Sequence, residues 1–406
     1  MLDFHTIKKI TIFGSGVTAN AVREKLKEFS EFSEVAPEDN PDLGILSPGL
    51  HTDEYQSKYH FPLLSEIDLA YQLFSYVGKL PYFITISGTN GKTTTTHLVA
   101  DLLQIPLAGN VGIPLINYVS KDIKKIPNMF SLELSSYQIE QSPTFTPDIY
   151  ILMNITPDHL DRHKTMENYG RIKLSLAKRQ NTQQHFLYNG QDEWSLKLLK
   201  ELLPLPTNLV DFQTKKDTFS NELRESPLLG AHNQDNLCAA LCAVSLVGNG
   251  FSFLEKVKQI KNIPHRLEKL APVNKITFIN DSKGTNPDST IAAINSVDCA
   301  HTILLLGGER KKVSYEPMFE LIKNEKLRVI TFGQDRSFFN DKLEGYSLLL
   351  GNAEKMSQAT LLAYKLASPQ DIVLLSPSCA SFDEFKNFEE RGNVFRELVS
   401  RISSEK

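Results

Sequence analysis

The 406 residues are enough for two to four domains, because a compact domain typically takes about 150 residues. Hydrophobic residues make up 41% and charged residues 23%, a composition typical of soluble globular chains that excludes wholesale disorder. Lys plus Arg number 44 against 48 Asp plus Glu. The net charge of -4 argues against a nucleic-acid coat or a polybasic membrane binder, since both depend on a positive field.

The four cysteines show no paired spacing of a zinc site, and their small number indicates a reducing compartment. The N-terminal string MLDFHTIKKI lacks the apolar core of a signal peptide, and no segment reaches the ~18 apolar residues of a membrane span. We therefore expect a cytoplasmic protein that binds neither nucleic acid nor a membrane.

The sequence begins the same α/β pattern three times: a β-branched apolar run, a Gly, Ser or Asn turn, and an amphipathic helical stretch. The first strand is expected at 10–13 with a helix at 19–29, and the acidic segment 28–42 is expected to be a loop. The second strand is expected at 83–87, and its helix starts near residue 93. The third set of strands is expected at 276–280, 303–306, 329–332 and 372–375. These runs predict parallel sheets covered by helices, with joints near 77–81 and 262–264.

A phosphate-binding loop is predicted where strand 83–87 meets the following helix, in the string GTNGKT. Backbone N–H groups of such a turn converge on phosphate oxygens, a lysine offsets the phosphate charge, and a threonine hydroxyl joins a Mg²⁺ shell. The spacing is shorter than the common G-x-x-x-x-G-K-[ST], so a plain Gly-rich turn with a solvated lysine is the alternative. The predicted nucleotide-binding residues are Gly88, Thr89, Asn90, Gly91, Lys92, Thr93 and Thr94.

Glu133 is the next candidate, because MFSLELSSYQIE places it within or at the end of an apolar strand. A buried carboxylate needs a partner, and Mg²⁺ that bridges nucleotide phosphates accepts one or two carboxylates plus phosphate and water oxygens. Ser135, Ser136 and Gln138 follow at positions from which they can bond the same phosphates or a polar substrate. The alternative is a strand-end glutamate in solvent.

The string NITPDHLDRH follows another apolar strand, at 149–153, and such loops carry function because the sheet aims them. His159 is a candidate metal ligand or phosphate contact, although an isolated histidine is more often a surface or core residue. Tyr169 and Lys173 are four residues apart on an expected helix and therefore share one face. Composition alone leaves Lys173 as a solvated surface lysine.

Nine strings in the same order along nearly the whole chain resemble the Mur ligase family. They are GTNGKT, GNVGIP, LELSSYQIE, LMNITPDHLDRH, LLGAHNQDNLCAA, PHRLE, INDSKGTNPDST, LLLGGERKK and LSPSCASFDEFKNFEERG. The last string resembles the D-glutamate-adding member more than its siblings. The resemblance implies an α/β fold of three domains: a Rossmann-like UDP-substrate domain at 1–80, a central P-loop domain for ATP and Mg²⁺ at 81–264, and a Rossmann-like acceptor domain at 265–406.

The resemblance also implies an activity, namely ATP-dependent addition of D-glutamate to UDP-N-acetylmuramoyl-L-alanine through an acyl phosphate, by a cytoplasmic monomer that makes peptidoglycan precursors. The implied catalytic residues are Lys92, His159, Lys173 and Lys283. Two Mg²⁺ ions are expected on Thr93, Glu133, His159 and a carbamylated Lys173. Further implied nucleotide contacts are Asn233, Asn236, Arg266 and Asp281.

For the acceptor amino acid, the resemblance points to Lys283, Thr285, Lys311, Ser381 and Phe388, a set whose cations and hydroxyls suit two carboxylates. For the UDP-sugar peptide it points to Thr18, Gly49, Asn110, Ser135 and Gln138. The chain departs from the family in three respects. Gly284 stands where alanine is usual, Lys312 beside Lys311 can share or take its role, and the first domain has no clear second strand with a polar tip.

Three alternative functions remain at this stage. The first is NAD binding, because the dinucleotide fingerprint G-x-G-x-x-G/A matches Gly14, Gly16 and Ala19. The acidic residue about 20 positions later is not on a clear strand, so we rank NAD binding below UDP binding. A related Mur or folylpolyglutamate-type ligase with another acceptor shares the central domain. A P-loop NTPase switch without ligase activity does not need the C-terminal strings.

Overall fold

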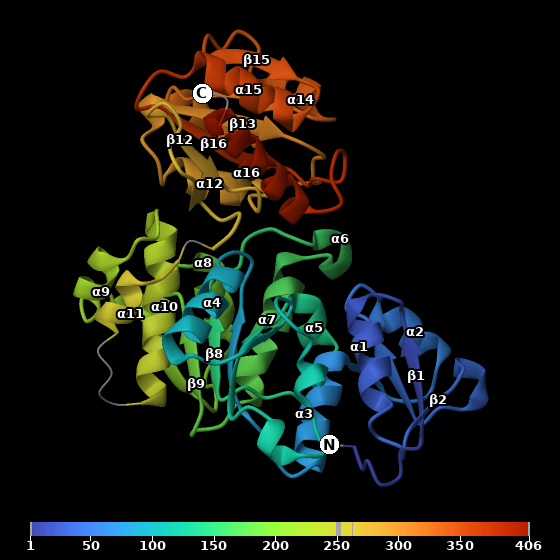
Figure 1. Cartoon of the computed structure of the whole chain (residues 1–406). Coiled ribbons are helices and arrows are strands. Elements are labelled where there is room, and N and C mark those ends of the chain that lie inside the picture. The colour runs from blue at the N-terminus through green and yellow to red at the C-terminus, as the bar shows by residue number, and fades with distance from the viewer. Residues whose placement is uncertain (1, 249–252, 262, 405–406) are drawn as a thin grey trace. The chain divides into compact units, whose positions relative to one another are not determined.

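The structure, a computed structural model, describes residues 2–248, 253–261 and 263–404. The chain forms two compact units, residues 1–225 with 235–257 and residues 226–234 with 258–406. Both units are α/β, as the sequence predicts, and the described residues contain three sheets (Figure 1). Asn262, which the sequence places at a joint, lies outside the described residues. Within the described ranges, no helix is both long and apolar enough to cross a membrane.

The N-terminal sheet has the strand order β2-β1-β3-β4, and all its pairs are parallel. Its strands are β1 (Lys9–Phe13), β2 (Ser33–Glu34), β3 (Leu43–Leu46) and β4 (Leu63–Ser65), and its helices are α1 (Val17–Leu26), α2 (Thr52–Lys58) and α3 (Glu66–Tyr76). Because strand side chains alternate between faces, Ile12 of β1 joins the core cluster with Val22 of α1, whereas Phe13 contacts Tyr55 of α2 (Figure 1). Helices α1 and α2 therefore cover opposite faces.

The prediction of a loop over 28–42 was wrong in part. This segment contains β2 and a 3-10 helix, Pro37–Asp39. Ser33 N donates to Lys8 O at 2.8 Å and Val35 N donates to Ile10 O at 2.9 Å, so backbone hydrogen bonds hold β2 against β1. Both residues of β2 are exposed, which is why the segment carries no hydrophobic strand pattern.

The central sheet has the order β10-β9-β8-β5-β7-β6, again with parallel pairs throughout. Its strands are β5 (Tyr82–Ser87), β6 (Leu107–Gly109), β7 (Met129–Glu133), β8 (Ile149–Leu152), β9 (His185–Tyr188) and β10 (Asn208–Asp211). Its helices are α4 (Lys92–Leu103), α5 (Ser136–Glu140), α6 (Leu160–His163), α7 (Met166–Arg179), α8 (Glu193–Leu202), α9 (Ser220–Glu225), α10 (Ala231–Val247) and α11 (Leu254–Lys258).

Helix α3 explains why the first two sheets belong to one compact unit. It is buried on nearly all sides, from Glu66 to Phe74. The ring of Phe74 lies 6.3 Å from that of Phe83 on β5, and one hydrophobic cluster includes β1, β3, α3 and the central strands. The sheets thus share a continuous core, and the segment 77–81 is the connection from α3 to β5.

The C-terminal sheet has the order β11-β12-β16-β13-β14-β15, parallel except for β11. Its strands are β11 (Glu268–Lys269), β12 (Thr277–Asn280), β13 (Thr302–Gly307), β14 (Arg328–Phe332), β15 (Leu349–Ala353) and β16 (Ile372–Ser378). One face packs on α12 (Pro287–Ile294), α13 (Glu316–Asn324) and α14 (Arg336–Lys342), and the other on α15 (Met356–Leu366) and α16 (Phe388–Ser404).

Two buried carboxyl groups on α3 fasten the N-terminal sheet to the central one. Glu66 Oε1 accepts a hydrogen bond from Ile116 N at 2.6 Å, and Asp68 Oδ1 accepts from Phe145 N at 2.7 Å. Burial raises the pKa of Glu66 to about 7, more than the hydrogen bonds from Ile116 and Leu115 lower it. Burial also raises the pKa of Asp68. Glu66 therefore keeps its proton in the folded state at pH values where an unfolded glutamate has lost it.

Glu66 makes the stability of the first unit pH-dependent. Because its folded pKa is raised from 4.5 to about 7, its stabilising contribution is full below pH 4.5 and is lost as the pH rises through 7. The total loss is about 3 kcal/mol. We expect the thermal midpoint of the wild type, relative to that of Glu66→Gln, to fall between pH 5 and pH 8.

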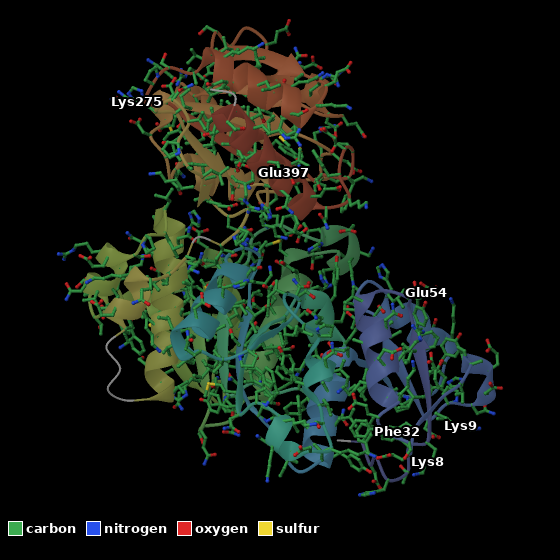
Figure 2. The ribbon with its side chains drawn as sticks, in the orientation of Figure 1. Lys8, Lys9, Phe32, Glu54, Lys275 and Glu397 are labelled. Atoms are coloured by element: carbon green, nitrogen blue, oxygen red, sulfur yellow. The ribbon has the colours of Figure 1, made fainter. Side chains whose placement is uncertain are left out.

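The control is Glu54→Gln, a substitution at an exposed position of α2 (Figure 2). The thermal midpoint of the wild type relative to that of Glu54→Gln should not fall between pH 5 and pH 8. A wild-type midpoint that keeps a constant offset from Glu66→Gln across this pH range contradicts the assignment.

Candidate active site

The predicted site residues of the first unit gather where β5, β7 and β8 end. In the sheet register Ile86 of β5 pairs with Glu133, and Ser87 pairs with Leu152 of β8. The loops that follow these strands therefore emerge side by side at one edge. In open α/β sheets this carboxyl edge is where ligands bind.

The Gly-rich loop between β5 and α4 has the backbone that the sequence predicts for a phosphate loop. Gly88 has φ +147° and Gly91 has φ +81°, values that favour glycine, and α4 begins at Lys92. The side chain of Asn154, just after β8, braces the loop. Its Oδ1 accepts from Asn90 N at 2.8 Å, and its Nδ2 donates to Asn90 O at 3.2 Å.

Two lysine side chains meet at one carbonyl of this loop. Lys92 Nζ donates to Gly88 O at 2.8 Å and to Thr89 O at 2.7 Å, while Lys173 Nζ donates to Gly88 O at 2.8 Å. Lys173 is 1% exposed, so its interpretation as a solvated surface lysine was wrong. Burial, followed by the charge of Lys92, holds the pKa of Lys173 well below its usual value. Burial and the charge of Lys92 therefore both favour the neutral amine form of Lys173.

Two tyrosines, one on α7 and one on β8, hold Lys173 in place. The Lys173 Nζ lies 4.7 Å from the ring centroid of Tyr169, whose hydroxyl is 3.2 Å from Thr89 Oγ1. Tyr150 of β8 donates from its hydroxyl to Lys173 O at 2.9 Å. The shared helical face that the sequence predicts for Tyr169 and Lys173 thus packs against the Gly-rich loop.

Glu133 is buried, so the alternative of a solvated glutamate was wrong. It is 1% exposed, and its Oε1 accepts from Asn110 Nδ2 at 2.8 Å. Its Oε2 is buried and has no hydrogen-bond partner among the described residues. A buried carboxylate oxygen with a free lone pair needs a cation or a donor. A carboxylate oxygen is a ligand type that Mg²⁺ accepts, as is the hydroxyl of the predicted ligand Thr93 in the first turn of α4.

Ser135 and Gln138 close the N-terminus of α5. Ser135 Oγ accepts from Gln138 N at 3.2 Å, and Gln138 Oε1 accepts from Ser135 N at 3.0 Å, a reciprocal capping box. The bonds fix both side chains just beyond the end of β7. The predicted substrate contacts therefore also have a structural role.

His159 begins α6 with a left-handed backbone, φ 53°. Its Nε2 lies 3.5 Å from Asp158 Oδ2, and its ring centroid lies 5.1 Å from that of Tyr137. His163, one turn later, is 4% exposed and its Nε2 lies 2.9 Å from Ser136 Oγ. Burial lowers the pKa of His163 to about 4, so this ring is neutral at physiological pH.

Hydrogen bonds connect the predicted UDP-side residue Gly49 to this edge of the central sheet. Arg162 Nη1 donates to Pro48 O at 3.4 Å, and Gln141 Nε2 donates to Leu50 O at 2.9 Å, so the loop is held on both sides of Gly49. Thr18 lies in the first turn of α1, after Gly16. Glu34 is the acidic residue about 20 positions after the start of the dinucleotide pattern. It lies in β2, so the view that this residue is not on a strand was wrong, and its Oε1 lies 2.8 Å from Arg23 Nε.

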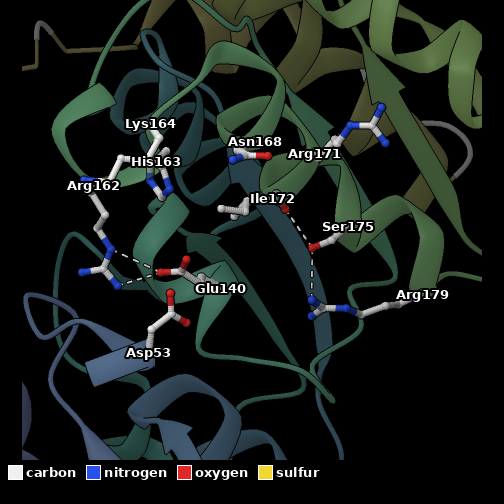
Figure 3. A pocket seen from close by; sticks show the side chains of 10 residues that line it. All are labelled: Asp53, Glu140, Arg162, His163, Lys164, Asn168, Arg171, Ile172, Ser175 and Arg179. Atoms are coloured by element: carbon white, nitrogen blue, oxygen red, sulfur yellow. Dashed lines mark hydrogen bonds and ion pairs between the residues drawn. The ribbon is translucent and has the colours of Figure 1, made fainter. Parts of the chain in front are cut away.

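A pocket of about 530 Å³ lies beside α6 and α7 (Figure 3). Arg162 on its wall pairs with Glu140 at 2.7 Å, and Arg179 Nη2 donates to Ser175 Oγ at 3.0 Å. None of the predicted site residues is among the described residues that line it. The pocket is thus separate from the groups around Gly88.

Helix α10 contributes to the Gly-rich loop through Asn236. A Cβ at position 91 would lie 2.4 Å from Asn236 Oδ1, so the two positions are in direct contact. Asn233, three residues earlier, belongs to the second unit, where its Nδ2 donates to Leu229 O at 2.7 Å. The unit boundary therefore runs between the two predicted nucleotide contacts.

In the second unit, two predicted acceptor residues are in contact. Lys283 Nζ lies 3.9 Å from the ring centroid of Phe388, the first residue of α16. Ser381 is 2% exposed, and Thr285 N donates to Lys283 O at 2.7 Å. Lys311 N donates to Tyr315 Oη at 3.1 Å, whereas the alternative Lys312 is exposed.

Asp281 and Gly284 form the turn after β12. Ser376 Oγ donates to Asp281 Oδ2 at 2.7 Å, and burial raises the pKa of Asp281 to about 7. A Cβ at position 284 would lie 2.6 Å from that same Oδ2, which accounts for glycine where the family usually has alanine. Arg266 lowers the pKa of Asp281 through its charge, so these two predicted nucleotide contacts are neighbours.

Comparison with known proteins matches both units to one family. Residues 86–224 match the Mur ligase middle domain, and residues 265–379 match the Mur ligase glutamate ligase domain. A UDP-N-acetylmuramoylalanine–D-glutamate ligase of Thermoanaerobacter pseudethanolicus is 34% identical over 394 residues, 89% of this chain and 84% of that protein. The chain belongs to the Mur ligase family.

Two further comparisons agree with this Mur ligase assignment. The enzyme of the same name from Acidobacterium capsulatum is 33% identical over 387 residues, 88% of this chain and 82% of that protein. The crystal structure of the MurF ligase from Thermotoga maritima in complex with ADP has a TM-score of 0.62 over 99% of this chain and 98% of that one. At 13% identity this second likeness shows the common fold alone.

Two residues of this Mur ligase were not assigned roles from the sequence. Asn154 is within a string that the sequence analysis singled out, but only the structure gives its bonds to Asn90. Arg391 lies in the C-terminal string FEERG, where the sequence pattern alone indicates an ordinary helical arginine. In the structure it is 0% exposed. Its position one turn after Phe388 was the available signal.

Asn154→Ala should weaken the binding of ADP by about tenfold or more, because the Gly-rich loop loses two hydrogen bonds that fix its shape. Titration calorimetry measures this. The matched control is Asn208→Ala, which also removes two bonds between a side chain and the backbone, but at the exposed start of β10. Equal ADP affinity in both variants contradicts the bracing role.

Proposed function

We propose that the chain is an ATP-dependent ligase that joins D-glutamate to the carboxylate of UDP-N-acetylmuramoyl-L-alanine, in peptidoglycan precursor synthesis. One observation carries the proposal: Lys92 and Lys173 converge on Gly88 O at the sheet edge where the buried Glu133 has an unsatisfied oxygen. This arrangement suits a polyphosphate and its counter-ion. The names of the relatives supply the two substrates.

The first step activates a carboxylate, which is a poor electrophile because its charge is delocalised. An oxygen of the alanyl carboxylate attacks the γ-phosphorus of ATP, the bond to the bridging oxygen breaks, and ADP leaves. The products are an acyl phosphate and ADP. Lys92 and the N–H groups of the Gly-rich loop stabilise the charge on the transferring group mainly by position and electrostatics.

The second step forms the amide. The amine of D-glutamate attacks the acyl carbon, the tetrahedral intermediate expels phosphate, and the amine loses a proton. His159 is a proposed base, since its ring is more than one-third exposed and sits beside Asp158. Lys283, Thr285, Lys311, Ser381 and Phe388 are proposed to hold the two carboxylates and the carbon chain of the acceptor.

Mg²⁺ would be held by Thr93, Glu133, His159 and Lys173. When bound, it offsets phosphate charge and orients the γ-phosphate. The remaining proposed nucleotide contacts are Gly88, Thr89, Asn90, Gly91, Thr94, Asn233, Asn236, Arg266 and Asp281. The proposed contacts of the UDP-sugar peptide are Thr18, Gly49, Asn110, Ser135 and Gln138.

Lys173 is proposed to be carbamylated. A neutral amine adds to CO₂ and releases one proton, so the product is an anion with carboxylate-like oxygens. The lowered pKa of Lys173, caused first by burial and then by Lys92, keeps the amine in the reactive neutral form. Carbamylation would thus turn a neutral side chain into an anion that the charge of Lys92 attracts.

We also propose that the chain works as three domains, a UDP-substrate domain at 1–80, an ATP domain at 81–264 and an acceptor domain at 265–406. Each range holds one sheet of the described structure, which supports the division. We further propose that the enzyme is a cytoplasmic monomer.

The purified protein should release ADP with UDP-N-acetylmuramoyl-L-alanine, ATP and Mg²⁺ only when D-glutamate is present. A panel of amino acids and a folate substrate separates this function from a ligase with another acceptor. ADP release that does not depend on any amine would favour an NTPase switch instead. A coupled ADP assay and mass spectrometry of the nucleotide-sugar product give the readout.

Lys173→Ala should lower kcat by about 100-fold, as expected for loss of a group that acts on charge in the transition state. A small carboxylate such as formate should restore part of the activity. Lys178→Ala, at an exposed position of the same helix, is the control and should keep full activity. Full activity of Lys173→Ala without any carboxylate would rule out the proposed role.

A further inference from the structure

Arg391 is a buried cation whose hydrogen bonds all go to uncharged groups. It lies on α16 and is 0% exposed. Its Nε donates to Ser282 Oγ at 3.0 Å, and its Nη2 donates to Ser282 O at 2.8 Å and to Cys379 O at 3.1 Å. Its Nη1 donates to Ala380 O at 3.2 Å. One guanidinium therefore connects the turn after β12 with the loop after β16.

Both of these loops carry proposed acceptor contacts. Ser282 precedes Lys283, and Ala380 precedes Ser381. Ser282 Oγ also donates to Phe388 O at 2.9 Å, so the start of α16 belongs to the same network. Because a guanidinium is planar and rigid, it fixes the distance between the groups that it joins.

The network extends to the loop of Lys311. Glu309 N donates to Ala380 O at 3.1 Å, and Ala380 N donates to Glu309 O at 2.9 Å. Ala380 O is thus shared between Glu309 N and Arg391 Nη1. A shift of this carbonyl would move the Lys311 loop as well as Ser381.

The charge of Arg391 is not neutralised by a direct partner. No ion pair of Arg391 occurs among the described residues of the unit. Burial lowers the pKa of Arg391 to about 10, a value at which the guanidinium stays charged at physiological pH. The charges of Asp383, Asp281 and Glu384 lie near enough to raise the pKa of Arg391, so they partly offset its charge without contacting it.

We propose that Arg391 is the positioning residue for the acceptor amino acid: through its hydrogen bonds to the two loops it sets the spacing between Lys283, Ser381 and Phe388. The inference rests on the proposed function, since it assigns these three residues to D-glutamate. Arg391 itself touches no substrate and acts through the two loops.

The test is steady-state kinetics of Arg391→Gln and Arg391→Lys with D-glutamate, ATP and UDP-N-acetylmuramoyl-L-alanine varied in turn. In Arg391→Gln the KM for D-glutamate should rise by about tenfold or more, while the KM for ATP changes by less than about twofold. Arg391→Lys keeps the charge but loses the fork of bonds, so its KM for D-glutamate should lie between the wild type and Arg391→Gln.

The control is Arg328→Gln. Arg328 donates to Asp371 Oδ2 at 3.0 Å at the opposite edge of the same sheet, so this variant should lose stability without a selective change in the KM for D-glutamate. If Arg391→Gln does not fold, Ser282→Ala replaces it, because it removes the hydroxyl that links Arg391 to Phe388. Ser282→Ala should raise the KM for D-glutamate several-fold.

The proposal is overturned if the soluble variants keep the wild-type KM for D-glutamate, or if their KM values for all three substrates rise together. A wild-type protein without D-glutamate-dependent ADP release overturns the proposed function and this inference with it. A wild type with that activity, next to variants with unchanged KM, overturns this inference alone.

Discussion

The site depends on the carbonyl of Gly88, which accepts hydrogen bonds from two lysines. A glycine is required there, because φ is +147° and a Cβ would lie 2.9 Å from that of Met153. Two ammonium groups at one carbonyl would repel each other, and the charge of Lys92 accordingly helps to lower the pKa of the buried Lys173. The fold resolves this by burying Lys173 on α7 and leaving Lys92 at the start of α4. The chemistry of the site therefore starts from backbone geometry.

Lys173 and Arg391, both buried, illustrate a difference between lysine and arginine. Burial favours the neutral amine of Lys173, whereas Arg391 keeps its charge because a guanidinium has a far higher pKa. Lys173 is thereby suited to chemistry, and Arg391 to holding loops at a fixed spacing. Each occurs at the carboxyl edge of a parallel sheet, one in each unit. The two units thus use the same edge of the same architecture in different ways.

The sequence was a good guide wherever hydrophobic pattern and backbone requirement agreed. Strands β1, β5 and β13 have continuous apolar runs, and the Gly-rich loop begins and ends with glycines whose φ values are positive, so their positions were predictable. Tyr169 and Lys173 share a face because helical spacing requires it. The sequence did not reveal that this face is buried, since burial depends on β5 and β8, which are distant in the chain.

Roles that depend on long-range contacts were not predictable. Asn154 braces a loop 64 residues away and Arg391 bonds to Ser282 109 residues away, and no local pattern reports such pairs. Likewise β2 exists only because β1 offers backbone partners, and neither Ser33 nor Glu34 has a strand-like side-chain pattern. In each case the tertiary partner determines the role.

The shortness of β2 has a consequence for the behaviour of the protein at high concentration. An exposed edge strand can pair with a strand of another chain and so extend the sheet. Because β2 has only two residues, it exposes too few backbone amide groups for such pairing. Glu34 further places a charged side chain, paired with Arg23, at this margin. The β2 edge of the N-terminal sheet is thereby protected against edge-to-edge aggregation.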